Sequence, residues 1–226
     1  MVKTIFIEGT YEGKVSLSDE VLDYLKKYNK IGLFAAVQFV ASLKNIKEQL
    51  KEKKMTVVTS KAKRCCVEGQ LLGCDCRSDS LNLEEDVDVF LYIGDGKFHP
   101  QALVYGNAQE VVCYNPKSNQ FSVLTEKDVD KNLKRYRGSM ARFHSARDVG
   151  VLITLKPGQE YYKKSLELEE KYPEKKFYYF IDNNISFNQL ENFNFIECWV
   201  NTACPRIGLD DQEAFRKGVV NLKDVL

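Results

Sequence analysis

Only two histidines, His99 and His144, occur among the 226 residues. This scarcity argues against a histidine-rich metal site and leaves few candidates for a Ser–His or Cys–His catalytic pair. The 33 basic and 32 acidic residues leave a formal net charge of +1, which lacks the basic excess of a nucleic-acid-binding protein. The composition therefore predicts no direct nucleic-acid partner.

Long apolar runs are also missing. The longest, residues 31–43, is interrupted by Gln38 and is shorter than the ~20 residues that span a membrane. Glu8 lies only a few residues into the first apolar run, so the sequence shows no signal peptide. We therefore expect no membrane contact and a cytoplasmic location.

The seven cysteines occur without a CxxC pair, so the spacing of a zinc ribbon is absent. Their number is odd and no export signal accompanies them, which argues against a disulfide framework. We expect reduced thiols, some of which serve as metal or cluster ligands.

The first part of the chain alternates short apolar runs with helical spacing. Residues 30–37 form a nearly continuous apolar run, which is typical of a buried parallel strand. Apolar residues at helical spacing follow over 39–54. The sequence predicts strands at 4–7, 30–37, 55–59, 87–93 and 110–114, helices at 39–54 and 101–105, a loop at 65–76, and a long charged helix at 126–147.

The second part repeats this alternation. It predicts strands at 149–155, 176–181 and 195–200, helices at 160–172 and 186–192, and a polar, partly helical tail from Asp210. Ser186 is the expected helix cap. We therefore expect the α/β fold class, with two tandem three-layer-type α/β domains, 1–146 and 147–226, that have mostly parallel sheets of similar topology.

Cys204 lies in the loop that follows the strand expected at 195–200. The carboxyl ends of parallel strands are where α/β sheets build their sites. Pro205 biases Cys204 toward an extended conformation, and an outward thiolate suits an iron–sulfur cluster. Arg206 can stabilise a thiolate or bind a carboxylate. The alternative is a half-buried structural cysteine in a turn.

Cys74 lies in a Gly/Cys-rich loop with Cys65, Cys66 and Cys76. Two glycines of this loop, Gly69 and Gly73, would allow a tight path around a bulky cofactor. The alternative is a flexible surface loop that happens to carry thiols.

The segment 94–99, GDGKFH, follows another expected strand. Its glycines would let backbone amides approach a ligand closely. The segment does not match GxGxxG and no Walker lysine–serine pair follows it, so a plain turn is the alternative. For His99, which precedes a proline, a structural role is likewise favoured over that of a base.

Five motifs occur together in order. They are GLFAAVQ at 32–38, GQLLGCD at 69–75, YIGDGKFHP at 92–100, LKPGQ at 155–159 and WVNTACPRI at 199–207. This set resembles the archaeal-type diphthamide synthase family, which consists of noncanonical radical SAM enzymes. The resemblance extends over nearly the whole chain.

The resemblance implies three similar α/β domains around a central cavity, each giving one cysteine to a 4Fe–4S cluster. It also implies that S-adenosylmethionine binds at the open iron and is cleaved to a 3-amino-3-carboxypropyl radical, which adds to a histidine of translation elongation factor 2. On this basis Cys74 and Cys204 are the expected cluster ligands. The residues expected to hold S-adenosylmethionine are Gln38, Gly94, Asp95, Gly96, Phe98, His99 and Arg206.

The family's first domain, with its own ligand cysteine, has no counterpart in this sequence. A first-domain polypeptide or a homologous subunit is the expected source of the third thiolate, and Cys65, Cys66 or Cys76 is the alternative. A second reading is a non-catalytic partner that docks a catalytic homologue or elongation factor 2. We also expect Cys74 and Cys204 to face one cavity, since the sequence places each at the end of an equivalent strand of its domain.

Overall fold

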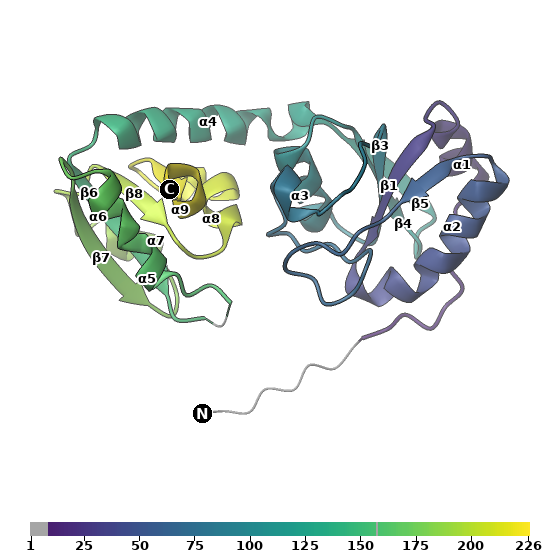
Figure 1. The fold of residues 1–226 in the computed structure, drawn as a ribbon, viewed down its shortest axis with the longest axis horizontal. Coiled ribbons are helices and arrows are strands. Elements are labelled where there is room, and N and C mark those ends of the chain that lie inside the picture. The colour runs from purple at the N-terminus through teal and green to yellow at the C-terminus, as the bar shows by residue number, and fades with distance from the viewer. Residues whose placement is uncertain (1–8, 157) are drawn as a thin grey trace. The chain divides into compact units, whose positions relative to one another are not determined.

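A computed structural model describes residues 9–156 and 158–226. The chain divides into two compact units, one ending at Val129 and the other formed by Asp130–Leu226. In both units strands and helices alternate along the chain (Figure 1). The strand predicted at 4–7 lies outside the described residues. Within the described ranges, no helix combines the length and the apolar character that a membrane span requires.

The first unit contains a five-stranded sheet of order β2-β1-β3-β4-β5. Its strands are β1 (Lys30–Ala35), β2 (Thr56–Val58), β3 (Val89–Ile93), β4 (Val111–Asn115) and β5 (Gln120–Leu124). All neighbours pair in parallel except β4 and β5. Every residue of β3 is buried, as expected for a parallel strand that is covered on both faces.

Helices cover both faces of this sheet. They are α1 (Asp19–Leu25), η1 (Val37–Ser42), α2 (Leu43–Glu52), η2 (Ser78–Ser80) and α3 (Phe98–Gly106). The β1–α2–β2 and β3–α3–β4 connections run in opposite directions along the sheet. Right-handed crossovers therefore place α2 and α3 on opposite faces, and Figure 1 shows the strands between them.

The second unit contains a four-stranded parallel sheet of order β7-β6-β8-β9. Its strands are β6 (Asp148–Thr154), β7 (Lys176–Asp182), β8 (Cys198–Asn201) and β9 (Val219–Asn221). This order repeats the order of β1 to β4, so the predicted similarity of topology is confirmed. The predicted long helix is α4 (Glu126–Ser145). The unit boundary falls in its first turn, whereas the sequence placed the boundary after the helix.

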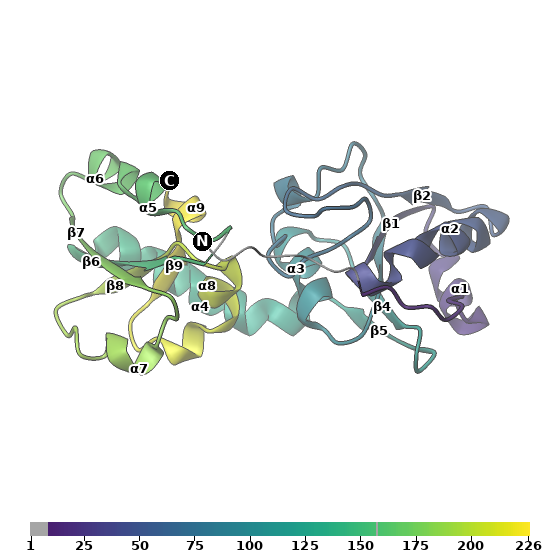
Figure 2. The ribbon, with the colours of Figure 1, turned by 90° about the horizontal axis from the view of Figure 1, so that it is seen from below.

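Alternate residues of this sheet enter two hydrophobic clusters. The cluster on one face joins Val149 and Val151 of β6 to Phe143 of α4. The cluster on the other face joins Leu152 to Trp199 and Phe215. The remaining helices are α5 (Tyr162–Ser165), α6 (Glu167–Lys171), α7 (Phe187–Leu190), α8 (Pro205–Asp210), η3 (Gln212–Ala214) and α9 (Leu222–Val225). Figure 2 shows α6 and α9 on one side of the strands and α7 on the other.

Several local predictions were wrong. The single helix expected at 160–172 is two short helices, α5 and α6. The Ser186 side chain makes no capping hydrogen bond, although the residue does precede α7. The sequence also missed β5, whose residues alternate between exposed and covered positions, and β9, which has only three residues and lies in the stretch expected to be a polar, partly helical tail.

Candidate functional site

The predicted site residues of the first unit gather at one edge of its sheet. The chain leaves β1 and β3 in opposite directions, so a crevice is expected outside the carboxyl ends of these two neighbours. Gln38 lies in η1, directly after β1. Gly94, Asp95 and Gly96 lie between β3 and α3. Both segments therefore lie outside the carboxyl ends of these two strands, and their joint lining of one cavity stays a prediction.

The loop that carries Cys74 returns to this edge although it follows β2. The Ala35 N–H donates to the Gly69 carbonyl at 2.7 Å, and the Leu71 N–H donates to the Ala35 carbonyl at 2.9 Å. Gly69 has a φ of +78°, in the left-handed region that favours glycine. These two bonds tie the loop to the carboxyl end of β1.

Asp75 organises the turn next to Cys74. Its side chain is 1% exposed, and its Oδ2 accepts hydrogen bonds from the Leu72 N–H at 3.1 Å and the Cys65 thiol at 3.4 Å. Burial raises the pKa of Asp75 and also that of Cys65. Cys65 is thus a hydrogen-bond donor inside the loop, while Cys74 is half-buried.

The Cys74 loop packs directly against the start of α3. A Cβ added to Gly73 would lie 2.3 Å from Cε1 of Phe98. The His99 ring contacts the Phe98 ring edge-on, with centroids 5.5 Å apart. Burial raises the pKa of Asp75; the hydrogen bond from the Leu72 N–H opposes this most, and the charge of His99 opposes it least. The structure therefore brings the turn at residues 73–75, which contains Cys74, close to Phe98 and His99.

Gly94 and Gly96 have different reasons to be glycine. A Cβ at Gly94 would lie 2.6 Å from the Tyr92 hydroxyl, so packing within the unit requires its absence. Gly96 has a φ of +70° and no atom within 4 Å of an added Cβ. The tip of this loop therefore faces open space, and both neighbours Asp95 and Lys97 are exposed.

In the second unit, Asn201 fixes the loop that carries Cys204. Asn201 is 2% exposed. Its Nδ2 donates to the Cys204 carbonyl at 2.9 Å and to Oδ1 of Asn221 at 2.8 Å, while its Oδ1 accepts the Ala203 N–H at 3.1 Å. Cys204 has φ −58° and ψ 125°, so the extended conformation predicted from Pro205 is confirmed. Its thiol is free and half-buried.

Arg206 binds a carboxylate, as its chemistry predicts, but the carboxylate belongs to Asp210 on the same helix. Nε and Nη2 lie 2.7 Å and 2.6 Å from Oδ2 of Asp210. The Arg206 side chain is only 3% exposed. A role for Arg206 in holding S-adenosylmethionine stays a prediction.

Cys74 and Cys204 do not follow equivalent strands, so that part of the sequence argument was wrong. Cys204 follows β8, whose counterpart in the first unit is β3, whereas Cys74 follows β2. The topological counterpart of Cys204 is Lys97, because each is the residue before the helix that follows the third strand. Backbone hydrogen bonds to Ala35 bring the Cys74 loop to the carboxyl end of β1. No sequence pattern predicts these bonds.

Comparison with known proteins decides the family. A family model described as "Putative diphthamide synthesis protein" matches residues 1–225. The chain belongs to this diphthamide synthesis family. Its similarity to the 2-(3-amino-3-carboxypropyl)histidine synthase of Pyrococcus horikoshii is 29% identity over 99% of this chain and 65% of that protein. Subunit 1 of the synthase from Dictyostelium discoideum is 28% identical over 87% of this chain and 43% of that subunit.

Solved structures confirm the fold of this diphthamide-family chain. A crystal structure of Dph2 from Pyrococcus horikoshii is similar with a TM-score of 0.76 and 27% identity, over 93% of this chain and 61% of that chain. A structure of Dph2 with a 4Fe–4S cluster is similar with a TM-score of 0.73 and 27% identity, over 91% and 59%. The chain thus spans about three fifths of the archaeal relatives it matches.

The residues present fit thiolate ligation. Iron–sulfur clusters are held by cysteine thiolates, and Cys74 and Cys204 form no disulfide and are neither exposed on the surface nor fully buried. Within each described unit, no three His, Cys, Asp or Glu side chains form a group that could hold a metal ion. Cys74 and Cys204 belong to different units, and their convergence on one cavity stays a prediction.

Sequence reasoning missed two residues that shape the site, Asp75 and Asn201. Asp75 directly follows Cys74, and Asn201 is the last residue of β8, the strand before Cys204. Both side chains are almost fully buried. A polar residue beside a candidate ligand was the available signal, but burial decides whether such a residue holds the loop or faces water.

Proposed function

We propose that this chain provides the second and third domains of a 2-(3-amino-3-carboxypropyl)histidine synthase. The reaction transfers the 3-amino-3-carboxypropyl group from S-adenosylmethionine to a histidine of translation elongation factor 2. The observation that carries the proposal is the placement of Cys74 and Cys204 in anchored loops outside parallel strands, in a chain matched by the family over residues 1–225.

In this function Cys74 and Cys204 are the cluster ligands that the chain contributes. When bound, the cluster supplies the electron for reductive cleavage of S-adenosylmethionine. Asp75 and Asn201 hold the two cysteine loops through their hydrogen bonds. A loop that is already ordered loses less conformational entropy when its thiolate binds.

The chain's own residues also prepare the substrate side. Gln38 and the Gly94–Gly96 segment follow β1 and β3 at the edge where a ligand crevice is expected, and the open space at Gly96 lets a ligand approach the backbone. Phe98 is 52% exposed and contacts the Cys74 loop through Gly73. Its ring can shield the Cys74 thiolate from water.

We assign the third thiolate to a domain outside these 226 residues. Within the Cys74 loop, the Cys65 thiol is buried and hydrogen-bonded to Asp75, and Cys76 is also buried. Ligation by either would require the loop core to open. Cys66 is exposed and therefore serves as the control.

The test is anaerobic reconstitution with iron and sulfide, followed by iron counting and EPR, with and without a separate first-domain chain. With that chain present, Cys74→Ala and Cys204→Ala should each lower the iron content sharply, because each removes a ligand. Cys66→Ala and Cys76→Ala should leave the iron content unchanged.

Two outcomes would contradict the assignment. If the lone chain binds four irons stably and loses them on Cys76→Ala, Cys76 is the third ligand. If no cluster forms even with the first-domain chain, the catalytic role fails and the reading as a non-catalytic partner gains support. Mass spectrometry of elongation factor 2 after incubation with S-adenosylmethionine and a reductant then tests the transfer itself.

A further inference from the structure

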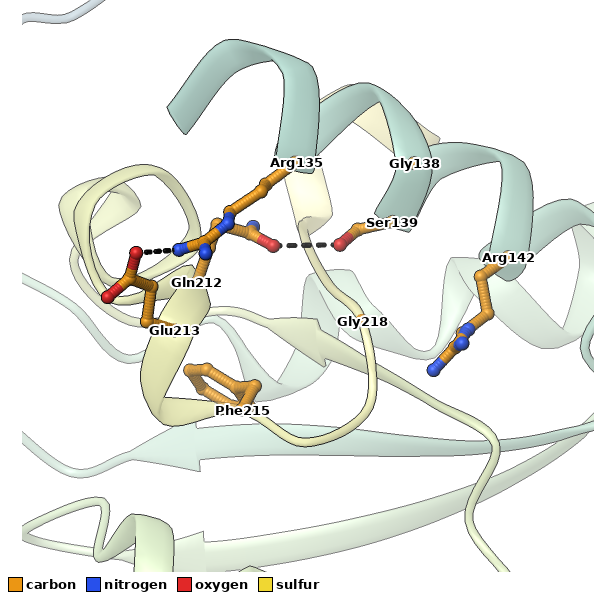
Figure 3. A pocket seen from close by; sticks show the side chains of 8 residues that line it. All are labelled: Arg135, Gly138, Ser139, Arg142, Gln212, Glu213, Phe215 and Gly218. Carbon is orange, nitrogen blue, oxygen red and sulfur yellow. Dashed lines mark hydrogen bonds and ion pairs between the residues drawn. The ribbon is translucent and has the colours of Figure 1, made fainter. Parts of the chain in front are cut away.

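The second unit contains a pocket of about 500 Å³ between α4 and the segment that leads into β9. Its lining residues are Arg135, Gly138, Ser139, Arg142, Gln212, Glu213, Phe215 and Gly218 (Figure 3). Gly218 directly precedes β9, so the pocket borders the amino-terminal edge of the parallel sheet. Cys204 follows β8 at the carboxyl-terminal edge, and the pocket is therefore separate from the cluster loop.

The charge of the pocket wall is positive. Arg135 forms an ion pair with Glu213, and Lys131 lies 2.7 Å from the same carboxylate. Arg142 has no ion pair among the residues that the structure describes, and Figure 3 draws no bond between its guanidinium and the other lining residues. Arg135 and Lys131 thus share the Glu213 carboxylate. Arg142 adds a third positive charge without a carboxylate partner among the described residues, which leaves an excess positive charge for a ligand.

The pocket floor is already ordered. The Ser139 hydroxyl donates to Oε1 of Gln212 at 2.7 Å, and Nε2 of Gln212 donates to the Val219 carbonyl at 2.8 Å. Both side chains are buried. A Cβ at Gly218 would lie 2.9 Å from the Ser139 hydroxyl oxygen, so this glycine permits the close approach of the two walls. A ligand would meet a preformed surface.

Gly138 is the observation that points to a ligand. Glycine within a helix costs about 0.5–1 kcal/mol relative to alanine, yet Gly138 has no atom within 4 Å of an added Cβ and no left-handed φ. Neither packing nor backbone conformation therefore requires glycine here. Its missing side chain leaves the helix wall open between Arg135 and Arg142, which are separated by two helical turns, or about 10 Å.

From these observations we infer that the pocket binds a small organic or inorganic polyanion, with two or more phosphate or carboxylate groups. Arginine is suited to both groups because its guanidinium donates in a planar fork. Two arginines separated by two helical turns suit two anionic groups better than one. The volume lies in the usual range for small-molecule sites, and Phe215 adds an aromatic wall.

The inference is tested by isothermal titration calorimetry of the full chain with pyrophosphate, ADP and citrate at low ionic strength. We expect saturable one-to-one binding of pyrophosphate or citrate that weakens with added salt. Citrate alone would assign a carboxylate ligand, and pyrophosphate alone a phosphate ligand. Tighter binding of ADP than of pyrophosphate would place its nucleoside against Phe215.

Two variants and one control locate the binding. Arg142→Gln removes the unpaired charge and should weaken binding by about tenfold or more, which corresponds to about 1.4 kcal/mol. Gly138→Leu should abolish binding while raising the melting temperature, because leucine favours the helix and fills the gap. Arg137→Gln makes the same charge change on α4 at a residue that does not line the pocket, and should leave binding intact. The inference is overturned if no probe binds at 10 mM, a concentration ~10⁴-fold above the Kd of a micromolar site. Equal binding by all three variants would overturn it as well.

Discussion

Gly150→Ala should destabilise the second unit strongly. Gly150 in β6 is paired with Trp199 in β8, and an added Cβ would lie 2.2 Å from Cζ3 of the indole. Carbon atoms pack best at about 3.5–4.0 Å, so the ring would have to move by more than an ångström. Trp199 is only 2% exposed and packs against Phe180, with ring centroids 5.1 Å apart.

The expected cost follows from this lack of space. Overpacking a well-packed core costs about 1–3 kcal/mol, and the depth of this overlap places Gly150→Ala at the upper end. Alanine also lowers the conformational entropy of the unfolded chain, which offsets about 0.4–1 kcal/mol of this loss in stability. The net loss is about 2 kcal/mol, which lowers the melting temperature of a unit of this size by about 8–16 °C.

Gly73→Ala provides the matched control. Its Cβ would lie 2.3 Å from Phe98, nearly the same overlap, but the Phe98 side chain is 52% exposed and can turn into solvent. The stability of the first unit should therefore change by less than about 1 kcal/mol, since ring displacement and the entropy gain nearly cancel.

Trp199 is the only tryptophan, so its fluorescence reports the unfolding of the second unit alone, while circular dichroism follows both units. Urea titrations with both probes give the two free energies of unfolding. Equal losses of unfolding free energy for Gly150→Ala and Gly73→Ala would refute the reasoning. The space into which the displaced ring can move would then have no effect on stability.

Two further outcomes are expected. Asn201→Ala should lower the free energy of unfolding of the second unit by about 2–4 kcal/mol in the same urea assay, since it removes three hydrogen bonds that are each worth about 0.5–1.5 kcal/mol; an unchanged midpoint would contradict the anchoring role. In native protein at pH 8, iodoacetamide should label Cys66, Cys74 and Cys204 well before Cys113 and Cys198. Burial raises the pKa of Cys113 and of Cys198 to about 12. At pH 8, only about one in 10,000 of these two thiols is then ionised. Mass spectrometry of labelled peptides checks this order, and Cys198 reacting as fast as Cys66 would contradict it.

The strands and their parallel arrangement were predictable because buried parallel strands leave a clear apolar signature. The run at residues 30–37 and the run at 87–93 became β1 and β3. Strand β5 has no such signature, because Gln120 and Ser122 face outward. Strand β9 depends on pairing with β8, a contact over about 20 residues of chain that local pattern does not encode.

Part of the candidate site was likewise predictable from the sequence, and part was not. The motif cysteines and the Gly94–Gly96 turn were identifiable from residue type and order. The hydrogen bonds that return the Cys74 loop to β1 depend on the three-dimensional path of residues 59–69, where no periodic pattern exists. For the same reason Asp75, buried beneath the turn, was indistinguishable in sequence from a solvated acid.

The contact between Gly73 and Phe98 couples two binding events that would otherwise be independent, one against the Phe98 ring and one at the Cys74 thiol. A molecule that binds against the Phe98 ring restricts the rotation of the ring. Because the ring packs on Gly73, this also restricts the turn that contains Cys74. Thermodynamic linkage is reciprocal, so occupancy at Cys74 must alter the affinity beside Phe98 by the same factor as the reverse. The order in which the ligand at Cys74 and the ligand beside Phe98 bind therefore affects the rate at which both sites fill. It does not change the equilibrium occupancy of either site.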